Sequence, residues 1–171
     1  RTYDNMMNKL KYGGLKENPD IYLDETVIRM CYTHRRLFSE LVQELIREGK
    51  TDKALKALQR AEEELPASLM PHNYMGGSIE LADSWLKLGK KAEGTKILDE
   101  VGQTSKEYLE WYLSLDTRRM LQASNNCLLH LSNLYRISQV FVQADAEKAE
   151  SYRKEMENYA ARFQAQGMKL F

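Results

Sequence analysis

The stretch from Phe38 to Pro66 constrains the fold of this chain more than any other. Apolar residues recur around it at three- and four-residue steps on both sides of a Gly49-Lys50-Thr51-Asp52 turn, a spacing that places them on one face of each of two helices. The first stripe is Cys31, Phe38, Leu41 and Leu45, and the second is Ala54, Leu58, Ala61 and Leu65. Pro66 then ends the second helix, because proline lacks the backbone N–H. The stretch predicts a hairpin of two packed helices.

The order and spacing of several residues in this hairpin resemble the tetratricopeptide repeat. These residues are Phe38, Leu41, Val42, Leu45, Ala54, Leu58 and Pro66. A small residue such as Ala54 lets the two helices approach closely, and Phe38 fills the space beside it. Val42 stands where the pattern has glycine, so we expect the first helix to lie further from its neighbour. The resemblance implies a core built by stacking hairpins, which offers a groove without defining its ligand.

A second, divergent repeat follows the first. Its turn glycine, Gly89, lies 40 residues after Gly49, and Gly94 takes the place that the small Ala54 has in the first repeat. Glycine keeps the close contact there but weakens the helix by about 1 kcal/mol. Pro71 suits the first turn of a helix, so we expect the first arm of this repeat to begin there.

The rest of the chain also has the pattern of helices. Residues 91–115 fit either one long helix kinked near Gly102 or two helices, because Thr104 and Glu107 form a capping box. The sequence as a whole predicts an all-α fold, with tetratricopeptide-like hairpins stacked as a short right-handed solenoid and a C-terminal capping helix. We expect a single domain over residues 1–171. Its parts are an N-terminal helix and loop (1–23), the first repeat (24–66), the second repeat (70–115) and a C-terminal helical pair (117–167).

Composition limits the classes of function. The chain has 25 basic and 25 acidic residues among 171, so its net charge is zero and no overall field attracts nucleic acid. The longest uncharged run, Met120 to Tyr135, contains polar side chains that the interior of a bilayer would not accept. Two cysteines, Cys31 and Cys127, are too few for a disulfide framework. Since the sequence begins at Arg1 without an initiator methionine or a signal peptide, we expect it to belong to a longer protein.

Candidate chemistry is sparse. The sequence has no GxSxG, HExxH, phosphate-loop or EF-hand pattern, so we expect no catalytic residue and no cofactor. Cys31 and His34 repeat the spacing of Cys127 and His130, and four such side chains can bind zinc if two helices bring them together. The alternative, which we favour, is two buried cysteines, two hydrogen-bonded histidines and no metal. The run Glu62-Glu63-Glu64 predicts a solvated helix face.

One candidate surface for a partner is the concave side of the predicted solenoid, which the first helix of each repeat would line. Its residues are Arg36, Ser39, Gln43, Arg47, Asp83 and Lys87. Arg36 and Arg47 can pair with the carboxylates of a peptide. They equally fit ordinary surface charge, which contributes little binding energy.

A second candidate is the predicted helix from 117 to 143. Between Arg119 and Asp145 its only charged residue is Arg136. Either neighbouring helices cover this helix on both sides, or its uncharged polar residues form a surface for a partner. Those residues are Asn125, Asn126, Ser132, Asn133 and Gln139.

Several segments resemble the C-terminal soluble region of a family of bacterial multi-pass membrane proteins common in Bacteroidetes. The segments are Tyr3-Asp4-Asn5-Met6-Met7-Asn8-Lys9 with Tyr12-Gly13-Gly14, then Asp20-Ile21-Tyr22-Leu23-Asp24-Glu25, and Leu65-Pro66 with Asn73-Tyr74. That family, long labelled as a domain of unknown function, is similar to protein O-mannosyltransferases of the polytopic glycosyltransferase class. Catalysis in the family belongs to the membrane-embedded part, so the resemblance carries no catalytic residue to this chain. It implies a helical appendage on the periplasmic side of a membrane protein.

Three functions follow from these expectations. The first is a non-catalytic module that binds a protein or peptide partner, or presents the substrate of a parent membrane enzyme. The second is a purely structural domain that packs on the transmembrane part of its own parent and stabilises it. The third is a metal-binding or enzymatic domain, for which the sequence offers the least support.

Overall fold

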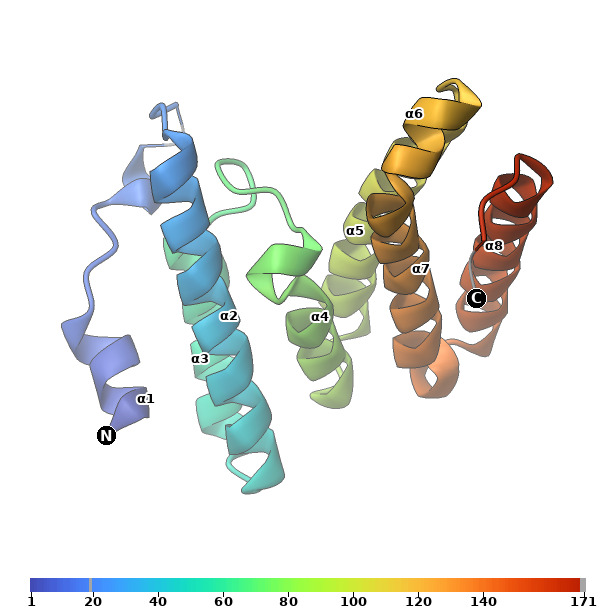
Figure 1. The fold of residues 1–171 in the computed structure, drawn as a ribbon. Helices are drawn as coiled ribbons and strands as arrows, with labels where there is room; N and C mark the ends of the chain where they lie inside the picture. Colours follow the sequence, from blue (N-terminus) through green and yellow to red (C-terminus); the bar gives the residue numbers. More distant parts are fainter. Residues whose placement is uncertain (19, 170–171) are drawn as a thin grey trace. The chain divides into compact units, whose positions relative to one another are not determined.

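The computed structural model describes residues 1–18 and 20–169, and within these the chain folds only into helices and the loops between them. It forms two compact units, Arg1–Ile97 and Leu98–Phe171, where the sequence predicts one domain. The helix α5 (Lys91–Leu113), labelled in Figure 1, crosses the boundary between the units in sequence. Its first residues belong to unit 1 and the remainder to unit 2.

Unit 1 is built on the predicted hairpin. Its two helices are α2 (Glu25–Arg47) and α3 (Thr51–Glu64), and they pack against each other. Asp24 caps α2, its carboxylate accepting hydrogen bonds from the backbone N–H groups of Thr26 and Val27 at 2.8 and 3.0 Å. Gly49, at a φ of 72°, makes the turn. Phe38, Ala54 and Leu58 are fully buried, as the repeat pattern predicts.

The first arm of the second repeat begins later than Pro71 predicts. The helix α4 spans Ser78–Lys87 and packs on α2, and a single 3-10 turn, η3 (Tyr74–Gly76), precedes it. Pro71 lies in a loop because its carbonyl accepts hydrogen bonds from Tyr32 and Arg35 on α2. Gly77, at a φ of 68°, redirects the chain into α4. A Cβ on Gly77 would lie 3.2 Å from the Cα of Arg36, so this position also needs to be small.

The N-terminal part of unit 1 is short and irregular. The chain begins with α1 (Thr2–Asp4), continues as the π-helical turn η1 (Asn5–Lys9), and makes a 3-10 turn, η2 (Leu15–Glu17). Met6 and Leu15 are buried and attach this segment to the core. The expected turn at Asn18-Pro19-Asp20 includes Pro19, which lies outside the described residues.

Unit 2 contains three further helices, α6 (Thr117–Gln122), α7 (Ser124–Ala144) and α8 (Ala146–Ala165). The last two form a hairpin with extensive mutual packing (Figure 1). Residues from the three long helices α5, α7 and α8 form the core of the unit. They are Leu98, Leu109, Leu134, Ile137, Phe141 and Phe163. A Cβ on Gly102 would lie 2.6 Å from the ring of Tyr152, so glycine lets α5 and α8 meet.

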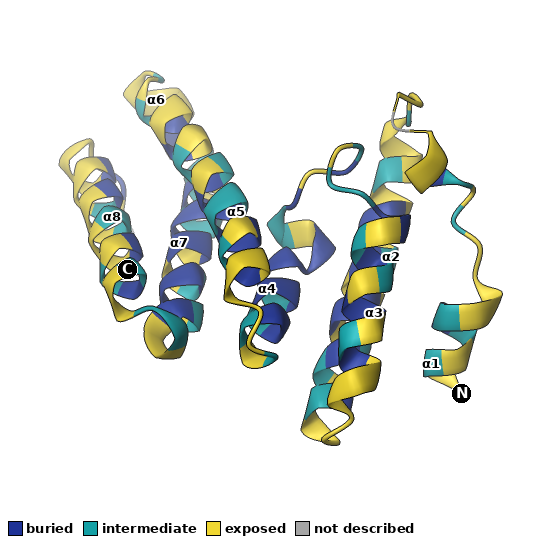
Figure 2. Cartoon of the chain, turned by 180° about the vertical axis from the view of Figure 1, so that it is seen from behind, coloured by how far each residue is buried: buried dark blue, intermediate teal, exposed yellow. Residues whose placement is uncertain are grey.

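At two places the structure shows whether an expected helical segment is one helix or two. Residues 91–113 form one helix, α5, and no second helix begins at Thr104. The predicted helix over 117–143 is instead two, because the chain turns at Ala123, where φ is −91° and ψ is 11°. Within residues 1–18 and 20–169, no helix is both long enough and apolar enough to cross a membrane. Figure 2 shows that buried and exposed positions alternate along the helices of both units.

Candidate partner-binding surface

The predicted first-arm residues lie in unit 1, and most of their charges already have partners. On α2, Arg36 and Arg47 are exposed, Gln43 is half-buried and Ser39 is buried. Arg47 pairs with Glu44 of its own helix at 3.0 Å. On α4, Lys87 pairs with Asp83 at 2.6 Å, again within one helical turn. Such exposed pairs contribute roughly 0.3–0.5 kcal/mol each, and they compete with an external carboxylate for the same cations.

The helix α7, whose single charged residue is Arg136, is covered on one side only. Its buried residues include Cys127, Leu131, Leu134, Ile137 and Phe141. Of the polar residues singled out in the sequence, Asn125, Asn126, Ser132 and Gln139 are exposed, whereas Asn133 is buried. The two interpretations of this helix therefore each describe one of its sides, and an uncharged surface is present.

The exposed side of α7 is regular. We define the α7 face as Asn125, Leu128, Ser132, Tyr135, Gln139 and Val142. These residues follow one another at alternating steps of three and four, which aligns them along one side of the helix. Tyr135 is 49% exposed and Val142 55% exposed. The α7 face thus presents large apolar side chains to solvent without a charged residue among them.

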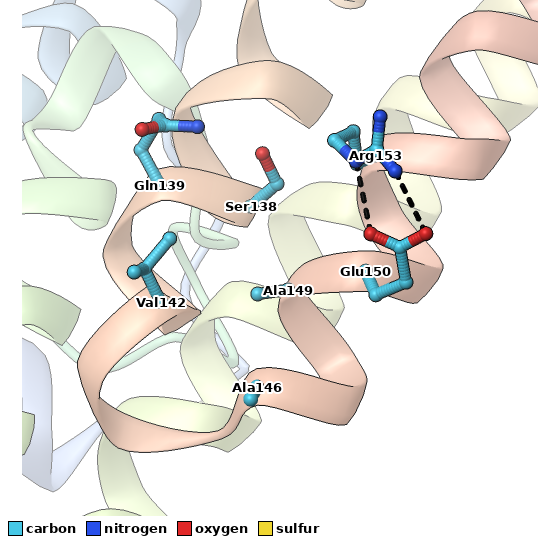
Figure 3. A pocket seen from close by; sticks show the side chains of 7 residues that line it. All are labelled: Ser138, Gln139, Val142, Ala146, Ala149, Glu150 and Arg153. Atoms are coloured by element: carbon cyan, nitrogen blue, oxygen red, sulfur yellow. Dashed lines mark hydrogen bonds and ion pairs between the residues drawn. The ribbon is translucent and has the colours of Figure 1, made fainter.

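A groove between α7 and α8 continues the α7 face at its C-terminal end. It has a volume of about 230 Å³ and is lined by Ser138, Gln139, Val142, Ala146, Ala149, Glu150 and Arg153. Figure 3 shows Gln139 and Val142 on one wall and Ala146 and Ala149 on the other. The carboxylate of Glu150 accepts two hydrogen bonds from the guanidinium of Arg153, at 2.8 and 2.9 Å, and this pair forms a polar edge. The groove can receive one apolar side chain beside Val142.

Buried polar contacts hold the opposite side of α7 in place. Ser105 of α5 lies 3.4 Å from Nδ1 of His130 and accepts a hydrogen bond from Asn133 at 3.3 Å. The His130 ring also stacks on Tyr108, with ring centroids 4.6 Å apart. Burial lowers the pKa of His130, so its imidazole is neutral at pH 7. These contacts orient α7 within unit 2 so that the α7 face points outward.

Neither cysteine–histidine pair has the surroundings of a reactive site. Burial raises the pKa of the Cys127 thiol to about 11 and also raises that of Cys31, which keeps both thiols protonated. The ring of His34 packs edge-on against Tyr12, with centroids 5.7 Å apart. Among residues 1–18 and 20–169, no three His, Cys, Asp or Glu side chains are arranged to hold a metal ion.

Unit 1 contains a serine–histidine–glutamate series that the sequence motifs did not reveal. His72 lies 3.1 Å from the hydroxyl of Ser78 through Nδ1 and 3.4 Å from the carboxylate of Glu62 through Nε2. Ser78 is fully buried, and its hydroxyl also accepts a hydrogen bond from the backbone N–H of Asn73. A buried hydroxyl in such contacts cannot reach a substrate. The series fastens the loop before α4 to α3.

The glutamate run on α3 is only partly a solvated face. Glu63 is exposed, but Glu64 is 8% exposed and contacts Lys16 at 3.1 Å and Arg60 at 3.3 Å. The prediction is wrong for Glu64 because Lys16, distant in sequence, folds back over α3. This pair ties the N-terminal segment to the hairpin.

A larger cavity of about 660 Å³ lies between the N-terminal segment and α2. Its walls include Tyr3, Leu37 and Leu41, together with Glu40 and Glu44 on α2 and Glu48 at the C-cap of that helix. Lys53 contributes a cation that lies 5.4 Å from the centre of the Tyr3 ring. The cavity mixes charges of both signs, so its lining does not select one class of ligand.

Comparisons with protein families, with curated proteins and with solved structures found no match for this chain. Within the described residues, the structure is all-helical, with packed hairpins and an exposed side of α7 that carries Tyr135 and Val142.

Proposed function

We propose that this chain is a non-catalytic protein-interaction module and that it binds through the α7 face. The observation that carries the proposal is the placement of Tyr135 and Val142, about half exposed, on one side of α7, a helix whose single charged residue is Arg136, one turn from Ser132 and Gln139. Exposed apolar surface of this kind is favourable to cover, at about 25 cal/mol per Å² of apolar area removed from water.

The proposal also covers the arrangement of the helical hairpins and the place of the chain in a larger protein. We propose that the hairpins α2–α3 and α7–α8 are repeats of a tetratricopeptide-like right-handed solenoid, in which α8 would be the capping helix. The resemblance of the N-terminal segments to a Bacteroidetes membrane-protein family supports a place on the periplasmic side of a larger membrane protein. In that setting the module would hold a protein partner, or a protein substrate of its parent enzyme, near the membrane.

A capture experiment tests this function and separates the two candidate surfaces. The complete 171-residue chain serves as bait for crosslinking capture from solubilised cell envelope, beside two double variants. Tyr135→Lys with Val142→Lys charges the α7 face, and Arg36→Glu with Arg47→Glu reverses the charge of the first arm. All four positions are exposed, so both variants should remain folded, which circular dichroism checks.

We expect the α7 variant to lose most of the captured protein and the first-arm variant to retain it. Loss in the first-arm variant alone would move the binding site to Arg36, Gln43, Arg47, Asp83 and Lys87. Equal capture by all three baits would refute binding through either surface. Recovery of only the parent's transmembrane part would indicate that the module is structural.

A further inference from the structure

We propose that the N-terminal segment, residues 1–17, is a displaceable strap over the outer side of the α2–α3 hairpin, and that the surface beneath this strap binds a segment of another protein. The ligand has the chemistry of the strap itself, namely apolar side chains that become buried beside a lysine. The surface lies in unit 1, whereas the α7 face lies in unit 2, so the inference goes beyond the proposed function.

The strap lies across both helices of the hairpin, on the side away from α4 (Figure 1, Figure 2). On α2, the ring of Phe38 lies 6.0 Å from the ring of Tyr12, measured between centroids. On α3, the carboxylate of Glu64 pairs with Lys16 at 3.1 Å. The strap therefore marks a surface, built from both helices, that holds a peptide segment with an aromatic ring and a cation.

Few buried side chains attach the strap. Among residues 1–17, only Met6 and Leu15 are buried. Tyr22, in the connection to α2, is 88% exposed, and Asp24 caps α2 without any contribution from the strap. Segments with few buried apolar contacts open at a lower free energy than the whole fold. We therefore expect the strap to open while the hairpin stays folded.

The strap also fits its surface incompletely. The cavity of about 660 Å³ lies between the strap and α2, and Leu37, in one of its walls, is 41% exposed. Within the part of the chain that the structure describes, the buried hydroxyl of Tyr12 and Nδ1 of His34 have no hydrogen-bond partner. Buried polar groups without a partner disfavour the closed form. A ligand that covers Leu37 and offers His34 a hydrogen-bonding group would therefore compete with the strap for this surface.

Thiol labelling of the complete chain measures the opening. Met6→Cys places a thiol beneath the strap, where position 6 is 5% exposed, and Val42→Cys, at a fully buried position of α2, is the matched reference. With a maleimide under native conditions, we expect position 6 to react at least roughly 100-fold faster than position 42, because only the strap must open. Equal rates would show that the strap opens only when unit 1 unfolds, which would overturn the inference.

A labelled peptide with the sequence of residues 1–17, added to the complete chain, tests binding. Leu15→Ser with Lys16→Glu removes an apolar anchor of the strap and places a like charge beside Glu64. Arg60, 3.3 Å from the carboxylate of Glu64, still pairs with it in this double variant. By fluorescence anisotropy, we expect the double variant to bind the peptide at least roughly tenfold more tightly than the unmodified chain, in which the strap occupies the surface.

Lys11→Glu, at an exposed position of the strap, is the matched control and should bind the peptide no better than the unmodified chain. A folded double variant that does not bind the peptide would refute the binding surface, and equal binding by all three chains would refute its closure by the strap. Unfolding of unit 1 in the double variant, seen by circular dichroism, would show that the segment is a fixed part of the core and would also overturn the inference. Each of these failures leaves capture through the α7 face intact, because that capture is measured with variants of unit 2.

Discussion

Arg35 is a buried charged residue that joins three segments of unit 1 through hydrogen bonds. Its side chain is 1% exposed, and one guanidinium nitrogen donates to the carbonyls of Leu65 and Met70, both at 2.8 Å. The other terminal nitrogen donates to the carbonyl of Pro71 at 3.4 Å. Arg35 therefore joins α2 to the end of α3 and to the loop that leads into α4. We predict that Arg35→Met destabilises unit 1 strongly.

The size of the effect follows from these contacts. Methionine preserves much of the apolar stem but leaves two close carbonyls without their charged donor. Hydrogen bonds to charged groups contribute roughly 1.5–3 kcal/mol each, so the two short bonds together set a loss of about 3–5 kcal/mol. Arg35→Lys keeps the charge but replaces the planar guanidinium, which donates to several carbonyls, with a single ammonium. We expect this substitution to lower the free energy of unfolding by about 2 kcal/mol.

Urea unfolding in a Trp111→Phe background, followed through the fluorescence of Trp85, measures this loss, because Trp85 is buried in α4 of the same unit. The neighbouring Arg36→Met is the control, since Arg36 is exposed and its substitution should change the free energy of unfolding by less than about 0.5 kcal/mol. Equal effects of the two substitutions would show that the carbonyl contacts of Arg35 do not stabilise the unit.

Three further predictions concern single positions. Gly94→Ala should destabilise the chain by about 1–3 kcal/mol in thermal unfolding, because the added Cβ would lie 2.8 Å from the carbonyl oxygen of Ala82. This loss should outweigh the higher helix propensity of alanine. Unchanged stability would contradict the close contact. The pKa of His130 is lowered in the folded chain, so the unfolded chain binds a proton at this residue more readily. The free energy of unfolding should therefore fall as the pH drops below about 6.5. His130→Asn should flatten this pH dependence in urea titrations, and an unchanged pH dependence would show that other groups cause it. Glu64→Gln should cost about 1 kcal/mol and the exposed Glu63→Gln almost nothing in the same assay, and equal costs would argue against the contacts of Glu64 with the N-terminal segment.

The elements that could be predicted from the sequence depend on neighbouring residues. The α2–α3 hairpin follows from its apolar spacing, the Asp24 cap and the Gly49 turn, all of which act within a few residues. Gly94 also fits its expected role, since it lies where α4 and α5 approach closely. The α7 face was partly visible, because the scarcity of charge between Arg119 and Asp145 is a property of the sequence itself.

The features that could not be predicted arise from residues far apart along the chain. The carbonyl partners of Arg35 lie 30 to 36 residues away, so nothing local distinguishes this arginine from the exposed Arg36. The break between α6 and α7 falls at Ala123, although alanine favours helix. Which side of α7 is exposed depends on how α5 and α8 cover the other side. Only Tyr135 and Val142, continuing the spacing of Ser132, offered a signal for the apolar part of the face.

The most direct test of binding through the α7 face is site-specific photocrosslinking. A photoreactive p-benzoylphenylalanine replaces Tyr135 in the complete chain, and in a matched sample it replaces Tyr22, which is 88% exposed in unit 1. After illumination, mass spectrometry identifies what each position has bound. We predict a discrete protein adduct from position 135 and none from position 22. Equal labelling at both positions, or no adduct at 135, would contradict a binding role for the α7 face.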